Sequence, residues 1–232
     1  MKLDIFISGE NVDLCIPTKE FSLKSNWFSW FNDSNNTKYL EQGLYPNTRE
    51  DQMKFFTNSK NRFILMISLK NKYNYIGTVS LSNINFLNKS CELAIVRDMK
   101  KNSISPILSS LESIALITQH AFEKMGMKRI SAGQHRKLEK WQNQMELIGY
   151  KLEGIHKNKA VKGNNIDDTV SISCCYDDFL YLKKSRGELF WDGNDRMKTR
   201  YKKKIKLGQF SQSLKKFFEK ERNKYYKKVF EL

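Results

Sequence analysis

Apolar runs of β-strand length alternate with short polar segments through the first half of the chain. Residues 62–69 (RFILMISL), 75–84 (YIGTVSLSNI) and 90–98 (SCELAIVRD) form three such runs. Because the polar segments between them are short, the pattern favours an antiparallel meander. The alternating residues 11–17 (NVDLCIP) predict an earlier strand.

Capping signals and helical spacing predict where helices begin and end. The aromatic-rich residues 23–32 predict a helix that ends in the polar run NDSNNT. Thr48 and Asp51 resemble a capping box that opens a helix over residues 51–58. Further on, Ser105 as N-cap and Pro106 as first helical residue predict a long helix that ends at Gly126.

The second half of the chain adds strands on both sides of another helix. Residues 128–133 predict a buried strand, residues 138–147 a helix that stops at Gly149, and residues 150–155 and 166–176 two final strands. The order predicts an α/β fold with a mixed, mostly antiparallel sheet flanked by helices.

Charge divides the chain near residue 183. Residues 183–232 contain 17 Lys and Arg against 6 Asp and Glu, so they carry 11 of the 16 net positive charges. This segment is too charged and too rich in glycine to pack by itself, although residues 209–230 predict a helix with an aromatic stripe. We therefore expect one domain over residues 1–182 and a basic helical extension over 183–232, which suits an anionic partner such as nucleic acid or a membrane surface.

Composition narrows the class of protein. With 40% hydrophobic residues and a mean hydropathy of −0.61, the 232-residue chain can bury a full core, and no apolar run approaches the ~20 residues that span a bilayer. We expect a cytoplasmic protein with free thiols, since Cys15, Cys91, Cys174 and Cys175 lack metal-ligand spacing. The sequence contains no P-loop, dinucleotide fingerprint or nucleophile elbow, and we expect no metal.

The segment from Cys91 to Gly154 resembles a known family. CELAIV, NSISPILSSLES, AFEKMGMKRI and QMELIGYKLEG follow one another in the order typical of the GCN5-related N-acetyltransferase (GNAT) family. The resemblance implies a GNAT-like fold with acetyl-CoA as co-substrate. In that family a glycine-containing turn holds the pyrophosphate, whereas this chain supplies Ser105, Leu108 and Ser110 there. The turn is therefore degenerate.

The resemblance also implies which residues bind the coenzyme. The splayed strand would offer backbone groups to the pantetheine arm, and hydroxyl, amide and lysine groups would replace the missing glycines. A simpler alternative is that these serines only cap and line a helix. The predicted coenzyme-binding residues are Ile95, Val96, Lys101, Asn102, Ser103, Ser105, Ser109, Ser110 and Asn143.

The predicted catalytic residues are Glu92 and His135. Glu92 stands where related acetyltransferases place a carboxylate that accepts the amine proton, and its alternative role is that of a solvent-facing strand residue. His135 follows the end of a strand and is the better titrating candidate nearby. Met145 occupies the position where the family often has a tyrosine that protonates the thiolate, and methionine cannot donate a proton.

The N-terminal part resembles the GNAT branch found with surface-polysaccharide and amino-sugar biosynthesis. This resemblance implies that the acceptor is an amine on a nucleotide-linked sugar and that the reaction belongs to surface glycan biosynthesis. The alternatives are a protein N-terminus or small amine, as in ribosomal-protein acetyltransferases, and a binding module without catalysis; a homodimer is compatible with each. Aromatic and polar side chains would contact the acceptor, namely Trp27, Tyr39, Tyr45 and Asn47.

Overall fold

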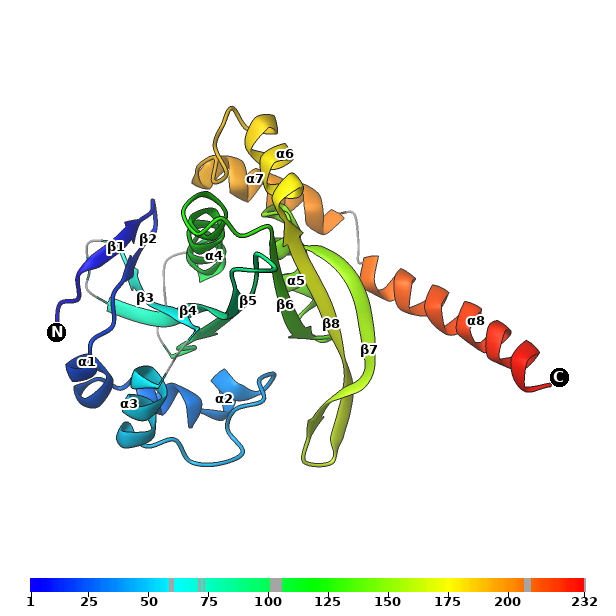
Figure 1. The fold of residues 1–232 in the computed structure, drawn as a ribbon, viewed down its shortest axis with the longest axis horizontal. Coiled ribbons are helices and arrows are strands. Elements are labelled where there is room, and N and C mark those ends of the chain that lie inside the picture. Colours follow the sequence, from blue (N-terminus) through cyan, green and yellow to red (C-terminus); the bar gives the residue numbers. More distant parts are fainter. Residues whose placement is uncertain (59–60, 71, 73, 101–105, 207–209, 232) are drawn as a thin grey trace.

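The protein is built around one eight-stranded sheet, seen in a computed structural model that describes residues 1–232 except 59–60, 71, 73, 101–105, 207–209 and 232 (Figure 1). The strand order is β1-β2-β3-β4-β5-β6-β8-β7, with β5 and β6 parallel and the other neighbours antiparallel. The predicted mixed, mostly antiparallel sheet is confirmed. The strands are β1 (Ile5–Ser8), β2 (Val12–Cys15), β3 (Phe63–Leu69), β4 (Asn74–Asn85), β5 (Ser90–Arg97), β6 (Arg129–His135), β7 (Lys151–Lys162) and β8 (Asn165–Cys175).

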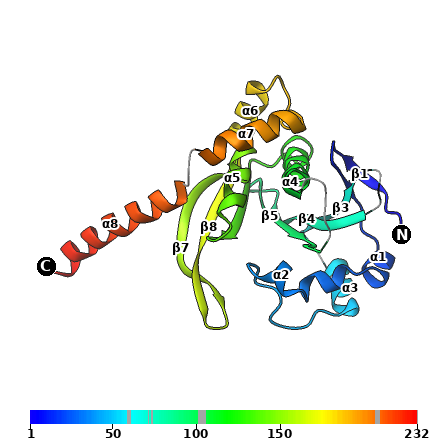
Figure 2. The same ribbon diagram turned by 180° about the vertical axis from the view of Figure 1, so that it is seen from behind.

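Helices cover both faces of the sheet (Figures 1 and 2). In β3, Leu65 and Ile67 belong to the main core, whereas Met66 packs in a second core with Phe21 and Trp27. Alternate strand residues point to opposite faces, so one strand serves both cores. The helices are α1 (Lys19–Lys24), a 3-10 helix (Trp27–Phe31), α2 (Ser34–Thr37), α3 (Arg49–Thr57), α4 (Pro106–Glu123), α5 (Glu139–Leu147), α6 (Tyr176–Ser185), α7 (Asn194–Lys206) and α8 (Phe210–Phe230).

Most predicted element boundaries are confirmed. β3, β4 and β5 form the antiparallel meander, and Thr48 and Asp51 make both hydrogen bonds of a capping box at the start of α3. α4 begins at Pro106 as predicted, while its predicted cap Ser105 lies outside the described residues. Gly126 follows α4 with a φ of +69°, a left-handed conformation that glycine adopts without steric conflict.

The predicted helix over residues 23–32 is wrong. α1 ends at Lys24, because the Ser25 N–H closes its last turn and the extended backbone of Ser25 then turns the chain away. Trp27 and Trp30 follow in the short 3-10 helix, and both indoles are buried in the second core. Tertiary burial of these two rings, rather than helical spacing, decides the local conformation.

The first part of the basic extension packs against the sheet and its helices. Phe190 and Met197 are fully buried in the main core. The buried Arg186 guanidinium donates hydrogen bonds to the carbonyl oxygens of Phe190 (2.7 Å) and Leu147 (2.6 Å). Residues 183–206, which we expected not to pack alone, thus find their partners on the domain.

Three of the four cysteines are buried. Cys15, Cys91 and Cys174 are buried and free. Burial raises the pKa of Cys91 to about 12, so this thiol stays protonated at neutral pH. Among the described helices, none is long and apolar enough to cross a membrane.

Candidate active site

The parallel strands β5 and β6 separate partway along their length, and we call this separation the fork. They pair only from Ser90–Arg129 to Glu92–Ser131. Beyond it, β5 continues beside β4 to Arg97, and β6 continues beside β8 to His135. The backbone groups that face the opening are consequently available to a ligand rather than to a neighbouring strand.

On the α4 side of the sheet, the fork carries Gln134. Its cross-strand neighbour Val170 belongs to the main core, so the Gln134 side chain points to the same face, although the residue also borders the cleft on the opposite face. The side chain is 8% exposed, and neither its amide nitrogen nor its amide oxygen has a hydrogen-bond partner among the residues that the structure describes. A buried carboxamide without partners costs roughly 1–3 kcal/mol, which a ligand with both a donor and an acceptor can recover. The sequence alone places Gln134 beside His135 near the predicted cleft but gives it no role.

The predicted coenzyme residues that the structure describes lie near the same face. Arg97, at the end of β5, donates a hydrogen bond from Nη1 to Ser110 Oγ on α4 over 3.0 Å. Burial lowers the pKa of Arg97, but the group remains a cation. Ser109 and Asn143 are buried on α4 and α5, and Ile95 and Val96 are half-buried. Lys101, Asn102, Ser103 and Ser105 lie outside the described residues.

The opposite face of the sheet opens into a cavity of about 1200 Å³, which we call the hairpin cleft. Its floor is β5 and β6 around the fork, including Glu92, Ser131 and His135. Its walls are the segment 32–44 around α2 and the β7–β8 hairpin (Figure 1). The cleft is therefore assembled from three parts of the chain that are far apart in sequence.

Glu92 lies on the cleft floor at the point where β5 and β6 part. Its carboxylate is exposed and accepts one hydrogen bond, from Asn83 Nδ2 over 2.9 Å. Within the described part of the chain, no ion pair involves this carboxylate. It is free to accept a proton or a hydrogen bond from a ligand.

His135 faces the same cleft. Its ring packs against Tyr39, with centroids 4.8 Å apart, and its Nδ1 accepts a hydrogen bond from the Lys137 N–H over 3.2 Å. Burial lowers the pKa of His135, and the opposing effect of Asp167, 4.0 Å from Nε2, is smaller. The imidazole is thus neutral at pH 7, with its proton on Nε2 if Nδ1 accepts.

Two carboxylates in the cleft, those of Glu153 and Asp167, are bound by side chains of the protein itself. Arg129 donates from Nη1 and Nη2 to the Glu153 carboxylate, and the Ser173 hydroxyl donates to the same carboxylate. Burial alone would raise the pKa of Asp167, but hydrogen bonds from the Asp168 N–H, Arg136 and Lys137 outweigh it and hold the pKa at about 2. These pairs shape the cleft and carry no free proton acceptor at neutral pH.

Lys162 connects the two walls of the cleft. From the tip of the hairpin its ammonium donates to three backbone carbonyl oxygens of the opposite wall, those of Thr37 (2.7 Å), Gln42 (2.9 Å) and Leu40 (3.4 Å). We call this contact the Lys162 clamp. No sequence signal identifies it, because its partners lie 120 or more residues away.

Several residues predicted to contact the acceptor lie elsewhere. Trp27 is 1% exposed in the second core, since its indole is the centre of that apolar cluster. Tyr45 is 85% exposed and is not among the cleft-lining residues. Asn47 bonds to Asn32, Phe28 and Gln52 and supports the α2 segment. Of the four, Tyr39 lines the cleft.

Comparison with solved structures finds the same architecture. A GCN5-related N-acetyltransferase from Brucella melitensis has a TM-score of 0.63 at 20% identity, covering 82% of this chain and 87% of its own. The chain has the GNAT fold. The ribosomal L7/L12 alpha-N-protein acetyltransferase RimL, solved with coenzyme A, shares the GNAT fold with a TM-score of 0.65 at 13% identity, covering 75% of this chain and 99% of its own.

The microcin C7 self-immunity acetyltransferase MccE, solved with acetyl-CoA and AMP, gives a TM-score of 0.60 at 18% identity. The similarity covers 72% of this chain and 93% of that chain. No protein-family model and no curated protein matches the sequence. The GNAT fold is therefore shown by structure alone.

Proposed function

We propose that this chain is an acyl-CoA-dependent N-acetyltransferase. The observation that carries the proposal is Glu92 at the fork, a carboxylate on the floor of a large cleft with no ion pair to any described residue. The other face of the same fork offers backbone groups and Gln134. A ligand arriving from each face would meet beside Glu92, which is the arrangement that direct transfer between two substrates requires.

The residues around the fork suit the coenzyme arm. Pantetheine carries two amides, and the free N–H₂ and C=O of Gln134 match one of them. The free backbone edge of Ile95 and Val96 would pair with the arm, and Arg97 with Ser110 would face its phosphate end. Leu108 is no obstacle on this side, because its side chain is buried in the main core.

Acetyl-CoA would supply an activated acyl thioester. Glu92 would take the proton of the attacking amine, directly or through water. Ser131, its neighbour across the fork, donates to the Cys91 carbonyl oxygen over 3.4 Å and so stays out of the proton path. Met145 is buried in the main core, so we assign protonation of the thiolate to water.

The acceptor that we propose is an amine on a nucleotide-linked sugar, in surface glycan biosynthesis. Support comes from the size of the cleft, from the aromatic Tyr39 beside neutral His135, and from the lysines Lys38 and Lys159 along the walls. AMP in MccE is a parallel for a nucleotide bound to this fold. The second candidate is a protein N-terminus, supported by the fold similarity to RimL.

Calorimetry with acetyl-CoA tests the enzyme, and mass spectrometry of acetylated products from nucleotide-linked amino sugars and N-terminal peptides tests the acceptor. We expect binding and transfer to the sugar amine. Transfer to peptides alone would favour the second acceptor. Absence of coenzyme binding at millimolar concentration would contradict the enzyme and favour a GNAT-like binding module.

A further inference from the structure

The last helix, α8, stands away from the rest of the protein. In both ribbon views α8 begins on the side of the molecule where β7 lies and extends outward into open space (Figures 1 and 2). Its first turns are tied to the body, with Lys215 bound to Asp168 and Gln212 to Glu139. Every residue from 220 to 231 is exposed. A 21-residue helix is roughly 31 Å long, so most of it is free to contact a partner.

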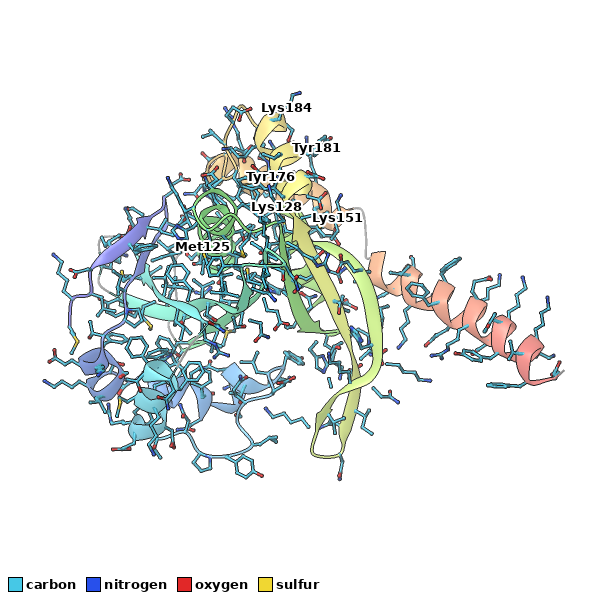
Figure 3. The ribbon with its side chains drawn as sticks, in the orientation of Figure 1. Met125, Lys128, Lys151, Tyr176, Tyr181 and Lys184 are labelled. Carbon is cyan, nitrogen blue, oxygen red and sulfur yellow. The ribbon has the colours of Figure 1, made fainter. Side chains whose placement is uncertain are left out.

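The side chains of α8 divide into two arcs. At roughly 100° per residue, one arc collects four large apolar side chains that are 39–61% exposed, and another collects four lysines, while Tyr226 and Phe230 lie between the two arcs. We call them the apolar arc and the lysine arc. Glu221 and Lys228 interrupt the apolar arc. Side chains along the outer part of α8 project into open space (Figure 3). The apolar arc is Phe217, Phe218, Tyr225 and Val229; the lysine arc is Lys216, Lys220, Lys224 and Lys227.

A partner that covers both arcs must offer apolar groups to the apolar arc and anionic groups to the lysine arc. A nucleic acid would neutralise the lysine arc but leave Phe217, Phe218 and Val229 in water. A second copy of α8 would cover the apolar arc but bring together two helices of like charge, since residues 210–230 carry seven Lys and Arg and two Glu. An anionic lipid surface offers hydrocarbon beneath charged headgroups and satisfies both arcs.

We propose that α8 binds the surface of anionic membranes and lies in the plane of the interface. The apolar arc enters the boundary between headgroups and acyl chains, and the lysine arc contacts the headgroups. The preceding helix α7 adds basic side chains on the same part of the protein, seven Lys and Arg against one Asp. This inference does not depend on acetyl transfer, because it uses residues outside the fork and the cleft.

Co-sedimentation of the full chain with lipid vesicles tests the proposal. We expect binding to vesicles of two parts phosphatidylcholine and one part phosphatidylglycerol, at least about tenfold weaker binding to phosphatidylcholine alone, and strong weakening in high salt. The triple variant Phe217→Ser, Tyr225→Ser, Val229→Ser should lose at least about tenfold in affinity. The matched control Tyr45→Ser, an exposed aromatic outside α8, should bind like the unmodified chain.

The same variants distinguish the other partners. Circular dichroism of each variant checks that helix content is retained. No binding of the unmodified chain to anionic vesicles, or equal binding by the triple variant, overturns the proposal. It is equally overturned if an RNA oligonucleotide binds tighter than the vesicles, or if light scattering shows a dimer that the triple variant abolishes.

Discussion

At the scale of single residues, the site depends on two polar side chains on opposite faces of the fork. Glu92 faces the cleft, and Gln134 faces the main core with both amide atoms unpaired. Each is unusual for its surroundings: within the described ranges, Glu92 is a carboxylate without a cation, and Gln134 is a buried amide without a hydrogen bond. Charged groups without a counter-ion and buried polar groups without hydrogen bonds are found most often where ligands bind.

Glu92→Gln should lower kcat about 100-fold or more while leaving acetyl-CoA affinity unchanged. The amide keeps the size and the hydrogen bond to Asn83 but cannot accept a proton at neutral pH. Steady-state kinetics and calorimetry measure the two quantities. Unchanged turnover would remove Glu92 from the mechanism.

Gln134→Leu should weaken acetyl-CoA binding about fivefold to tenfold and leave the unliganded protein as stable or more stable. The variant removes a buried group that has no partner until the coenzyme binds. Thr169→Val is the matched control, since its buried hydroxyl is also unpaired but faces the cleft. If calorimetry gives equal affinities for both variants, Gln134 has no part in coenzyme binding.

Asp167 makes stability depend on pH in the acid range. Its native pKa of about 2 lies below the ordinary 3.8, so its stabilising contribution is complete above about pH 4 and is lost as the pH falls through 2. Asp167→Asn should therefore cost about 1–2 kcal/mol in unfolding free energy at pH 7 and progressively less below pH 4. Urea unfolding across this range measures it, with exposed Asp177→Asn as control; a pH-independent loss would contradict the assignment.

At the scale of elements, the β7–β8 hairpin makes the cleft. The prediction ended the first of its strands at residue 155, because residues 156–165 (HKNKAVKGNN) are polar. The structure extends the ribbon to Lys162 and turns it at Gly163, whose φ is +58°. The tip of the β7–β8 hairpin does not pack against a hydrophobic core. The Lys162 clamp holds it against the α2 segment instead.

Lys162→Met should loosen the clamp, because it removes the donor but keeps an unbranched side chain of similar size. We expect faster tryptic cleavage after Lys38 and a rise in KM for the acceptor of about tenfold, because the walls no longer hold one another. Lys159→Met, also on the cleft wall, is the matched control for the cleavage rate. Equal cleavage rates for the two variants would show that the clamp does not close the cleft.

At the scale of the whole molecule, the basic extension has two structural roles. Residues up to α7 complete the main core through Phe190 and Met197, and α8 is exposed over its distal part. The division at residue 183, which charge alone suggested, remains a proposal. From this packing we predict that the boundary between the folded domain and the extension lies close to the start of α8.

Truncation tests this division. Removing residues 207–232 should leave the unfolding midpoint nearly unchanged, whereas removing residues 183–232 should destabilise the protein by several kcal/mol. Loss of Phe190 alone, as in Phe190→Ala, costs about 3–5 kcal/mol. Thermal unfolding of the three proteins measures the difference. Equal stability of both truncated forms would support the boundary at 183.

The amino-acid sequence alone is sufficient to predict the strands of the meander, the start of α4 and the order of elements that resembles the GNAT family. These features are local: alternation, turns and caps act over a few residues. It also identified Glu92, His135 and Tyr39, which line the cleft. Tertiary structure decided the fork, the unpaired state of Gln134, the Lys162 clamp and the burial of Trp27 and Phe190. Each of these depends on which distant segment arrives beside it, and no local pattern of residues encodes that choice.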